Sequence, residues 1–276
     1  MKFKLIFILF SLTMLLFLAI LIFLPSIMLG SALTISYWRT NWPMFIVLFL
    51  LFFTFVVYYL TNRRLFLLLE KEDWPALVHY LEERVIQKGK YSPRLVRLLA
   101  NSYLVLSESD GVINLERKIL AVKPALIDDN ALIFGTARIL GRDIPGALRF
   151  FELRKDKVKP MYKEWMRWYY GFALLLDRRF EDASSEFSFL AQMSKDGVIS
   201  ALSCFFLSES LSALLIQKEQ ELRDISSAGR ERVLRILPKI ENWRKEVTRL
   251  SSEIHAAAIS KYLDETGNWL YHSTKE

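Results

Sequence analysis

The chain has 276 residues, of which 53% are apolar, and it carries a formal net charge of +7 with a sequence pI near 9.4. This balance favours acidic partners or anionic lipid surfaces and gives only weak grounds for expecting nucleic acid. Because Cys204 is the only cysteine, the sequence excludes an intrachain disulfide and any metal site built from several cysteines.

The first predicted element is an apolar run from Leu5 to Leu24, twenty consecutive uncharged residues. Twenty helical residues span a hydrocarbon core of roughly 30 Å. A cleaved signal peptide is the alternative, but its apolar core would be about 7–15 residues long and end at a small-residue site. This run is longer and continues into Pro25-Ser26-Ile27, so we expect an uncleaved membrane helix.

A second apolar run, Met44 to Leu60, follows a short loop, and the two runs predict a transmembrane helical hairpin over residues 1–64. Neither run contains an ionisable side chain, which indicates a plain anchor rather than a transport path. The cations favour a multi-pass protein of a bacterial inner (cytoplasmic) membrane with both termini in the cytoplasm. Arg39 alone lies in the loop, whereas four cations flank the outer ends: Lys2, Lys4, Arg63 and Arg64.

Residues 65–217 have apolar residues at helical spacing and hardly a strand pattern anywhere, so we expect an all-α domain. Ser92-Pro93 is a helix start, with a capping residue before proline. Residues 134–154 resemble residues 170–190, thirty-six positions later. An internal period of this size predicts stacked helical hairpins. The matching pairs include Gly135 and Gly171, Ala147 and Ala183, and Phe151 and Phe187.

These offsets resemble the pattern of the tetratricopeptide repeat family over roughly residues 70–195, with Leu99-Ala100 and Tyr103 fitting an earlier unit. The resemblance implies a right-handed helical solenoid. It also implies a partner-binding groove lined by the first helix of each unit. Carried over position by position, the groove residues are Arg94, Arg97, Asn101, Asp129, Leu132, Thr136, Trp165, Trp168 and Phe172.

Some members of that family grip the C-terminal carboxylate of a peptide with a cation and an asparagine four residues later. Arg97 and Asn101 stand in that relation, on adjacent turns of one helix face, where both could donate to a carboxylate. The second asparagine that such a clamp expects is Thr136 here. A basic-to-aromatic groove for an extended or helical peptide is the broader interpretation.

A basic segment follows between the two clearest repeats, with Trp165 and Trp168 adjacent to it. Three interpretations are open: a solvated loop before the core aromatics of the next unit, contact with anionic lipid headgroups, and single-stranded nucleic acid. Its six cations are Arg154, Lys155, Lys157, Lys159, Lys163 and Arg167.

The C-terminal part, residues 218–276, predicts a turn around Ser226-Ser227-Ala228-Gly229 and then one continuous helix from about Pro238 to Tyr262. Apolar residues along this helix fall at heptad spacing, which leaves open a homo-oligomeric coiled coil or a helix that caps the last repeat. The preceding apolar helix, at 197–216, holds Cys204 as a small core residue.

The sequence contains no recognisable catalytic or metal-binding motif. His79, His255 and His272 lie far apart, and there is no phosphate loop or nucleophile elbow, so we expect no enzyme, metal or cofactor. The function that fits best is a membrane-anchored cytosolic scaffold or adaptor for a protein or peptide partner. The alternative is a structural subunit of a larger membrane assembly. The layout also resembles HemY-type membrane proteins found with heme-biosynthesis genes, although no heme-binding His/Cys arrangement is present.

Overall fold

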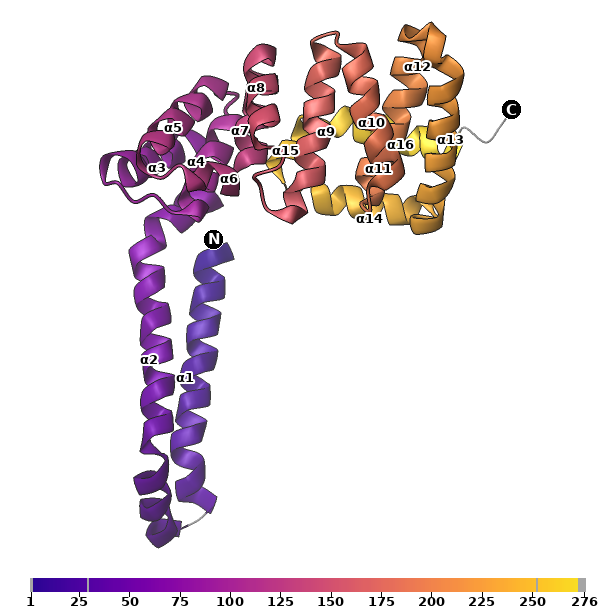
Figure 1. The fold of residues 1–276 in the computed structure, drawn as a ribbon. Coiled ribbons are helices and arrows are strands. Elements are labelled where there is room, and N and C mark those ends of the chain that lie inside the picture. The colour runs from indigo at the N-terminus through magenta and orange to yellow at the C-terminus, as the bar shows by residue number, and fades with distance from the viewer. Residues whose placement is uncertain (1, 29, 252, 273–276) are drawn as a thin grey trace. The chain divides into compact units, whose positions relative to one another are not determined.

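The computed structural model describes residues 2–28, 30–251 and 253–272, and every regular element in these ranges is a helix (Figure 1). The prediction of an all-α chain is therefore confirmed. The chain divides into two compact units, Met1–Tyr80 and Leu81–Glu276.

The first unit contains the two longest helices, α1 (Lys2–Met28) and α2 (Gly30–Glu70). They run antiparallel side by side, and the ring of Phe7 in α1 stacks on that of Tyr59 in α2 at 3.6 Å between centroids. The ring centroids of Phe10 and Phe55 lie 4.5 Å apart, so the apolar stretches of the two helices lie alongside each other. Their apolar side chains face outward, with Leu5 65% and Phe49 60% exposed.

Both helices are long and apolar enough to cross a membrane, with candidate spans at Leu5–Leu24 and Arg39–Glu70. A third candidate by composition, Gly197–Leu214, has 67% of its apolar window buried within the protein. The short loop predicted between the two apolar runs is wrong, because the chain is helical from Gly30 onward, with Pro43 inside α2. The side chains of Lys2 and Lys4, on which the orientation argument partly depends, lie outside the described residues.

One turn recurs four times along the chain. Glu72, Ser107, Arg142 and Arg178 all have φ between 53° and 62°, and they follow one another at intervals of 35, 35 and 36 residues. A left-handed residue of this kind closes a helix in a Schellman-type turn. The turns join α2 to α3 (Trp74–Glu82), α4 (Pro93–Val105) to α5 (Ser109–Val122), α7 (Ala131–Leu140) to α8 (Ile144–Arg154), and α9 (Pro160–Leu176) to α10 (Phe180–Met193).

The hydrogen bonds of these turns also match. The amide of Asp143 donates to the Arg138 carbonyl at 2.9 Å, as the amide of Arg179 donates to the Leu174 carbonyl at 2.9 Å. Earlier in the chain, the amide of Glu108 donates to the Tyr103 carbonyl at 2.8 Å. The periodicity recognised at 134–190 thus extends back to the end of α2.

Small residues permit the close approach of helices within a hairpin, as the repeat predicted. A Cβ added to Gly135 in α7 would lie 2.3 Å from the ring of Phe151 in α8. The equivalent atom on Gly171 would lie 3.2 Å from the ring of Phe187 in α10. Ser92 also caps α4 as expected, since its Oγ accepts a hydrogen bond from the amide of Leu95 at 3.3 Å.

Two expectations for the C-terminal part are wrong. No turn occurs at 226–229, because α13 (Glu219–Ile236) runs through it: Ser226 donates to the Cys204 carbonyl at 2.8 Å, and a Cβ on Gly229 would lie 2.4 Å from Cys204 Sγ. The continuous helix from 238 to 262 is instead three helices. They are α14 (Ile240–Leu250), α15 (Ile254–Ala257) and α16 (Ser260–His272).

Physically, the breaks let the C-terminal chain bend back over the array, where Ile259 is fully buried and Leu263 is 1% exposed. The apolar face of these helices thus packs on its own chain, as expected for a cap. The remaining elements are η1 (Glu83–Gln87), α6 (Ala125–Asp129), α11 (Gly197–Phe206), η2 (Leu207–Leu211), α12 (Ser212–Leu214) and η3 (Ile216–Lys218).

Candidate functional site

The C-terminal helices cover the aromatic part of the predicted groove. The ring of Trp165 lies 5.3 Å from that of His255 in α15, and the ring of Phe172 lies 5.5 Å from that of Tyr262 in α16. In Figure 1 this yellow segment passes behind α9 and α11. The trough that the repeat pattern implied is therefore filled here by the chain itself.

The nine predicted groove residues separate into two sets. Arg94 and Arg97 are exposed, and Asn101 and Asp129 are half-buried. The other five are buried: Leu132, Thr136, Trp165, Trp168 and Phe172. Thr136 donates its hydroxyl to the Leu132 carbonyl at 2.7 Å, within its own helix. Trp168 is fully buried among rings, and its Nε1 has no hydrogen-bond partner in the described part of the chain.

A cavity of about 180 Å³ remains at the basic end of the groove, next to the point where α15 begins. It joins four of the predicted residues to side chains that the sequence did not mark. Nothing local identifies His255, for instance, because Tyr169, which fixes it, is 86 positions away in sequence. The cavity is lined by Arg97, Asn101, Asp129, Asn130, Ala131, Leu132, Ile133, Tyr162, Glu253 and His255.

Arg97 is held in place at this cavity by the end of α6. Its Nε donates to Asn130 Oδ1 at 3.3 Å and its Nη2 to the Asp129 carbonyl at 3.3 Å. Asn130 is fixed in turn, because its Nδ2 donates to the Leu126 carbonyl at 2.9 Å. The guanidinium has donors left over, since it carries five N–H groups.

Asn101 has a buried amide oxygen without a hydrogen-bond partner among the described residues. An unmet buried acceptor is unfavourable by about 1–3 kcal/mol. The amide can accept from a ligand donor or, after a 180° rotation, donate to a carboxylate beside Arg97. Arg97 and Asn101 do share one cavity, so the predicted pair is brought together.

His255 connects the aromatic cluster to the cavity mouth. The hydroxyl of Tyr169 donates to the His255 carbonyl at 2.8 Å and lies 3.1 Å from Nδ1, while Nε2 lies 3.0 Å from Glu253 Oε2. Burial raises the pKa of Tyr169 well above its ordinary value, so the phenol stays protonated. The hydrogen bond from His255 lowers the pKa of Glu253.

The mouth of the cavity has charges of both signs. Lys159 Nζ lies 2.7 Å from Asp129 Oδ1, and this hydrogen bond raises the pKa of the exposed lysine. The positive charge of Arg97 opposes this rise in the pKa of Lys159, and it adds to the lowering of the Glu253 pKa, of which the hydrogen bond from His255 is the main cause. A ligand here would meet a guanidinium flanked by two carboxylates that already have partners.

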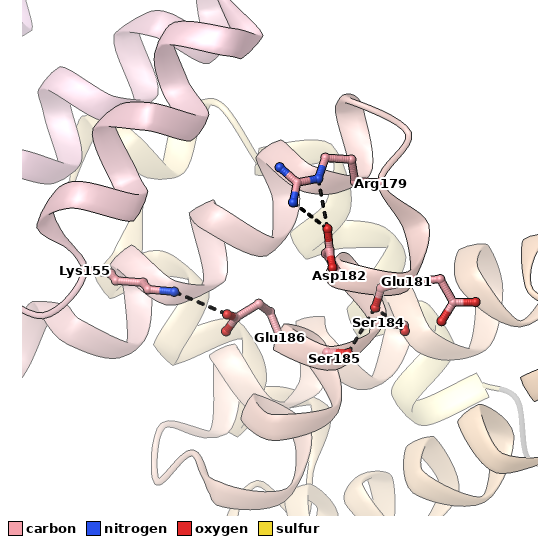
Figure 2. A network of polar contacts seen from close by, with 7 residues as sticks. All are labelled: Lys155, Arg179, Glu181, Asp182, Ser184, Ser185 and Glu186. Carbon is pink, nitrogen blue, oxygen red and sulfur yellow. Dashed lines mark hydrogen bonds and ion pairs between the residues drawn. The ribbon is translucent and has the colours of Figure 1, made fainter.

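Most of the predicted basic segment is ion-paired. Lys155 reaches Glu186 at 3.5 Å, as Figure 2 shows, and Arg167 pairs with the same carboxylate. Arg154 pairs with Asp128. Trp165 and Trp168 are buried, so their faces are not available for stacking on bases. Of the six cations, Lys157 and Lys163 remain without an ion pair to any described residue.

The described residues contain no group of three or more His, Cys, Asp and Glu side chains that could hold a metal ion. Cys204 is fully buried, and burial raises the pKa of its thiol to about 12, which keeps it protonated.

A protein of Treponema pallidum (strain Nichols), described as an uncharacterized protein, is 27% identical to this chain over 233 residues, which cover 82% of this chain and 74% of the relative. No solved structure matches the chain. A family model described as "Uncharacterised Treponema protein" matches residues 111–272. Since this match covers more than half of the chain, the protein belongs to that family.

Proposed function

We propose that this protein is a membrane-anchored helical scaffold that binds a protein or peptide partner at the cavity around Arg97 and Asn101. The observation that carries the proposal is this cavity, lined both by the held guanidinium of Arg97 and by Asn101, whose buried amide oxygen has no hydrogen-bond partner among the described residues. Polar groups of this kind, when they have no internal partner, are typical of binding sites.

The anchor is a pair of spans, α1 and the apolar part of α2. Their outward-facing side chains would form a very large exposed apolar surface in water, whereas a bilayer covers it. The third apolar stretch, Gly197–Leu214, is an interior helix because most of it is buried. With Arg63 and Arg64 after the second span, both termini lie in the cytoplasm of a bacterium.

The array is a tetratricopeptide-like right-handed solenoid of helical hairpins. The four matching turns at 35- and 36-residue intervals support this proposal. In such an array the first helix of each unit lines the inner face, which agrees with the position of Arg97, Leu132 and Trp165 near one segment of chain.

The aromatic half of the groove is closed to a partner in this proposal. Uncovering it exposes Ile259 and Leu263, and each of these buried side chains stabilises the packed state by ~1.5–3 kcal/mol. A partner segment that bound there would first have to displace the C-terminal helices, at a cost of several kcal/mol of lost apolar burial. The basic half needs no such displacement, so recognition takes place there.

The size of the cavity favours a short contact over a small-molecule ligand. Its volume of about 180 Å³ is below the ~300–1,000 Å³ of ordinary ligand pockets. A side chain or chain end of a polypeptide fits, and a carboxylate would pair with Arg97 while Asn101 donates to it.

Photocrosslinking in intact membranes tests the proposal. A photoreactive residue at Arg94, which is exposed one turn before Arg97, should give one discrete protein adduct that Arg97→Ala and Asn101→Leu both remove. A matched probe at Leu153, exposed on α8, should not give it. The same adduct from both positions, or an adduct indifferent to both substitutions, would refute the site. Trp165 and Trp168 cannot serve as test positions because their removal would disrupt the core.

A further inference from the structure

One end of the second unit combines unpaired cations with exposed apolar side chains. Successive helices in this unit alternate in direction, so that the connections α8–α9, α10–α11 and α13–α14 gather at the lower end of the array in Figure 1. The α7–α8 and α9–α10 turns, which contain Arg142 and Arg178, lie at the opposite end. We call the lower end the basic edge. It comprises Lys157, Met161, Lys163, Met193, Lys195, Arg235, Ile236 and Lys239.

The cations of the basic edge are free to contact an external partner. Lys157, Lys163, Lys195, Arg235 and Lys239 are all exposed, and none forms an ion pair with another described residue. Of the carboxylates near these cations in the chain, Asp156 and Glu241 are exposed, while two others are held by hydrogen bonds. Asp196 Oδ1 accepts from the amides of Val198 and Ile199 at 2.8 and 3.2 Å, and Glu164 Oε2 accepts from Ser194 Oγ at 2.6 Å.

The opposite end carries a more mixed charge. There Arg179 Nη2 lies 2.6 Å from Asp182 Oδ2 (Figure 2), and Lys218 pairs with Glu181. Arg142 and Arg178 are exposed at this end without an ion pair to another described residue, but each has an exposed aspartate beside it in the chain, Asp143 and Asp177. The basic edge therefore holds more unpaired cations than these turns.

Three apolar side chains project among these cations. Met161 is 70% exposed, Met193 is 64% exposed and Ile236 is 48% exposed. Met161 lies in the first turn of α9, while Met193 and Ile236 are the last residues of α10 and α13. Apolar tips surrounded by lysines are typical of surfaces that lie in a lipid interface, where the amines meet headgroups and the apolar ends enter the acyl boundary.

We propose that the basic edge docks on an anionic lipid bilayer. Headgroup phosphates complement the free amines, and a Debye length of about 8 Å at physiological salt limits this attraction to close approach. A chain held on a bilayer by α1 and α2 meets that condition, so this inference rests on the membrane anchor proposed above and not on the cavity at Arg97. Nucleic acid is less favoured, because Trp165 and Trp168 are buried and offer no stacking faces.

The test uses the full chain in vesicles, with single cysteines carrying an environment-sensitive fluorophore and a lipid-attached quencher. Cys204 is buried with a raised thiol pKa, so it stays unlabelled in the folded protein, and the unsubstituted chain checks this. The probes are Met193→Cys at the basic edge, Leu176→Cys at the opposite end and Leu16→Cys in α1. Both control positions are exposed leucines.

We expect strong quenching at Met193 in vesicles with anionic lipid, weak quenching in purely zwitterionic vesicles, and none at Leu176 in either. High salt and the combined variant Lys157→Gln, Lys163→Gln, Lys195→Gln, Lys239→Gln should remove the quenching at Met193 alone. Equal quenching at Met193 in both vesicle types, or equal quenching at Leu176, overturns the docking proposal. So does protection of the Met193 probe by single-stranded RNA with no dependence on lipid charge. An unquenched probe at Leu16 would instead overturn the anchor itself.

Discussion

Gly135 and Gly171 occupy the same position in consecutive hairpins but lie at different distances from the aromatic ring opposite. A Cβ would meet the Phe151 ring at 2.3 Å in the first case and the Phe187 ring at 3.2 Å in the second. Both Phe151 and Phe187 are fully buried, so neither ring can move toward solvent. The tighter site has no room for a methyl group, while the looser one needs a shift of a few tenths of an ångström.

Gly135→Ala should therefore lower the free energy of unfolding by about 1–3 kcal/mol, the range for overpacking a filled core. Gly171→Ala should cost less, because the added methyl group restores helix propensity with a smaller clash. Urea titrations of both variants in the same detergent measure the difference. Equal losses would contradict the difference in packing.

Glu253 precedes α15 and lines the cavity. Its carboxylate accepts from His255, and that hydrogen bond lowers its pKa below the ordinary value of 4.5. A lowered carboxyl pKa gives stability that is present above the unfolded-state pKa and is lost as pH falls through the folded-state pKa.

Acidification below about pH 4.5 should consequently loosen the segment around His255, and Glu253→Gln should reduce this pH dependence. Tryptophan fluorescence measures this loosening, because the centroid of the Trp165 ring lies 5.3 Å from that of His255. Asp264→Asn, at an exposed residue of α16, is the control. Identical pH profiles for the Glu253→Gln and unsubstituted chains would show that this carboxylate has no such role.

At the scale of elements, α13 joins the array to its cap through two arginines. Arg232 Nη2 donates to the Ala191 carbonyl at 2.6 Å, near the C-terminal end of α10, and to Ser200 Oγ at 2.8 Å, in the first turn of α11. Arg230 Nη2 donates to the Leu270 carbonyl at 2.8 Å near the end of α16. Each cation satisfies helix-end carbonyls and lies at the negative end of the helix dipole.

Arg232→Ala should destabilise the protein by about 2–3 kcal/mol, because several charge-assisted hydrogen bonds to helix-end carbonyls are lost. Arg235→Ala, one turn further along the same helix and exposed, should change stability by less than ~0.5 kcal/mol. The melting temperatures of the two variants, measured by thermal unfolding, test this difference in stability. A small effect of Arg232→Ala would mean that water replaces the guanidinium at the end of α10.

The elements themselves were largely predictable where a pattern repeats. Gly135 and Phe151 marked a hairpin, and Ser92-Pro93 marked the start of α4. The turn expected at 226–229 was wrong, because Ser and Gly there serve contacts with Cys204 from a distant helix and not a local bend. Local sequence could not show that, since the partner is 22 residues away.

At the scale of the whole molecule, the C-terminal helices belong to the core of the second unit. Leu263 is 1% exposed and Ile259 is fully buried, and Tyr262 contacts the rings of Phe172 and Phe206. A solenoid end needs such a cover, because its last repeat has no neighbour. Here the cover extends along the face that a partner would otherwise use.

Leu263→Ala should thus cost about 2–5 kcal/mol, as for other buried leucines, while Asp264→Ala on the exposed side of α16 should cost little. Truncation after Leu250 should leave Trp165 and Phe172 uncovered and the protein prone to aggregation. Thermal unfolding and size-exclusion chromatography in detergent measure both effects. A truncated chain that kept its stability and gained partner binding would show that the segment is a removable cover.

The sequence by itself determined the helical class, the two membrane-length apolar helices and the hairpin period, because each follows from residue spacing along a single element. It also brought Arg97 and Asn101 to one helix face. Only the tertiary structure decided that Trp165, Trp168 and Phe172 are covered, that His255 borders the cavity, and that the connections bearing Lys157, Lys195 and Lys239 come to the same end of the array. These features depend on contacts between segments far apart in the chain, which periodicity within one helix cannot specify.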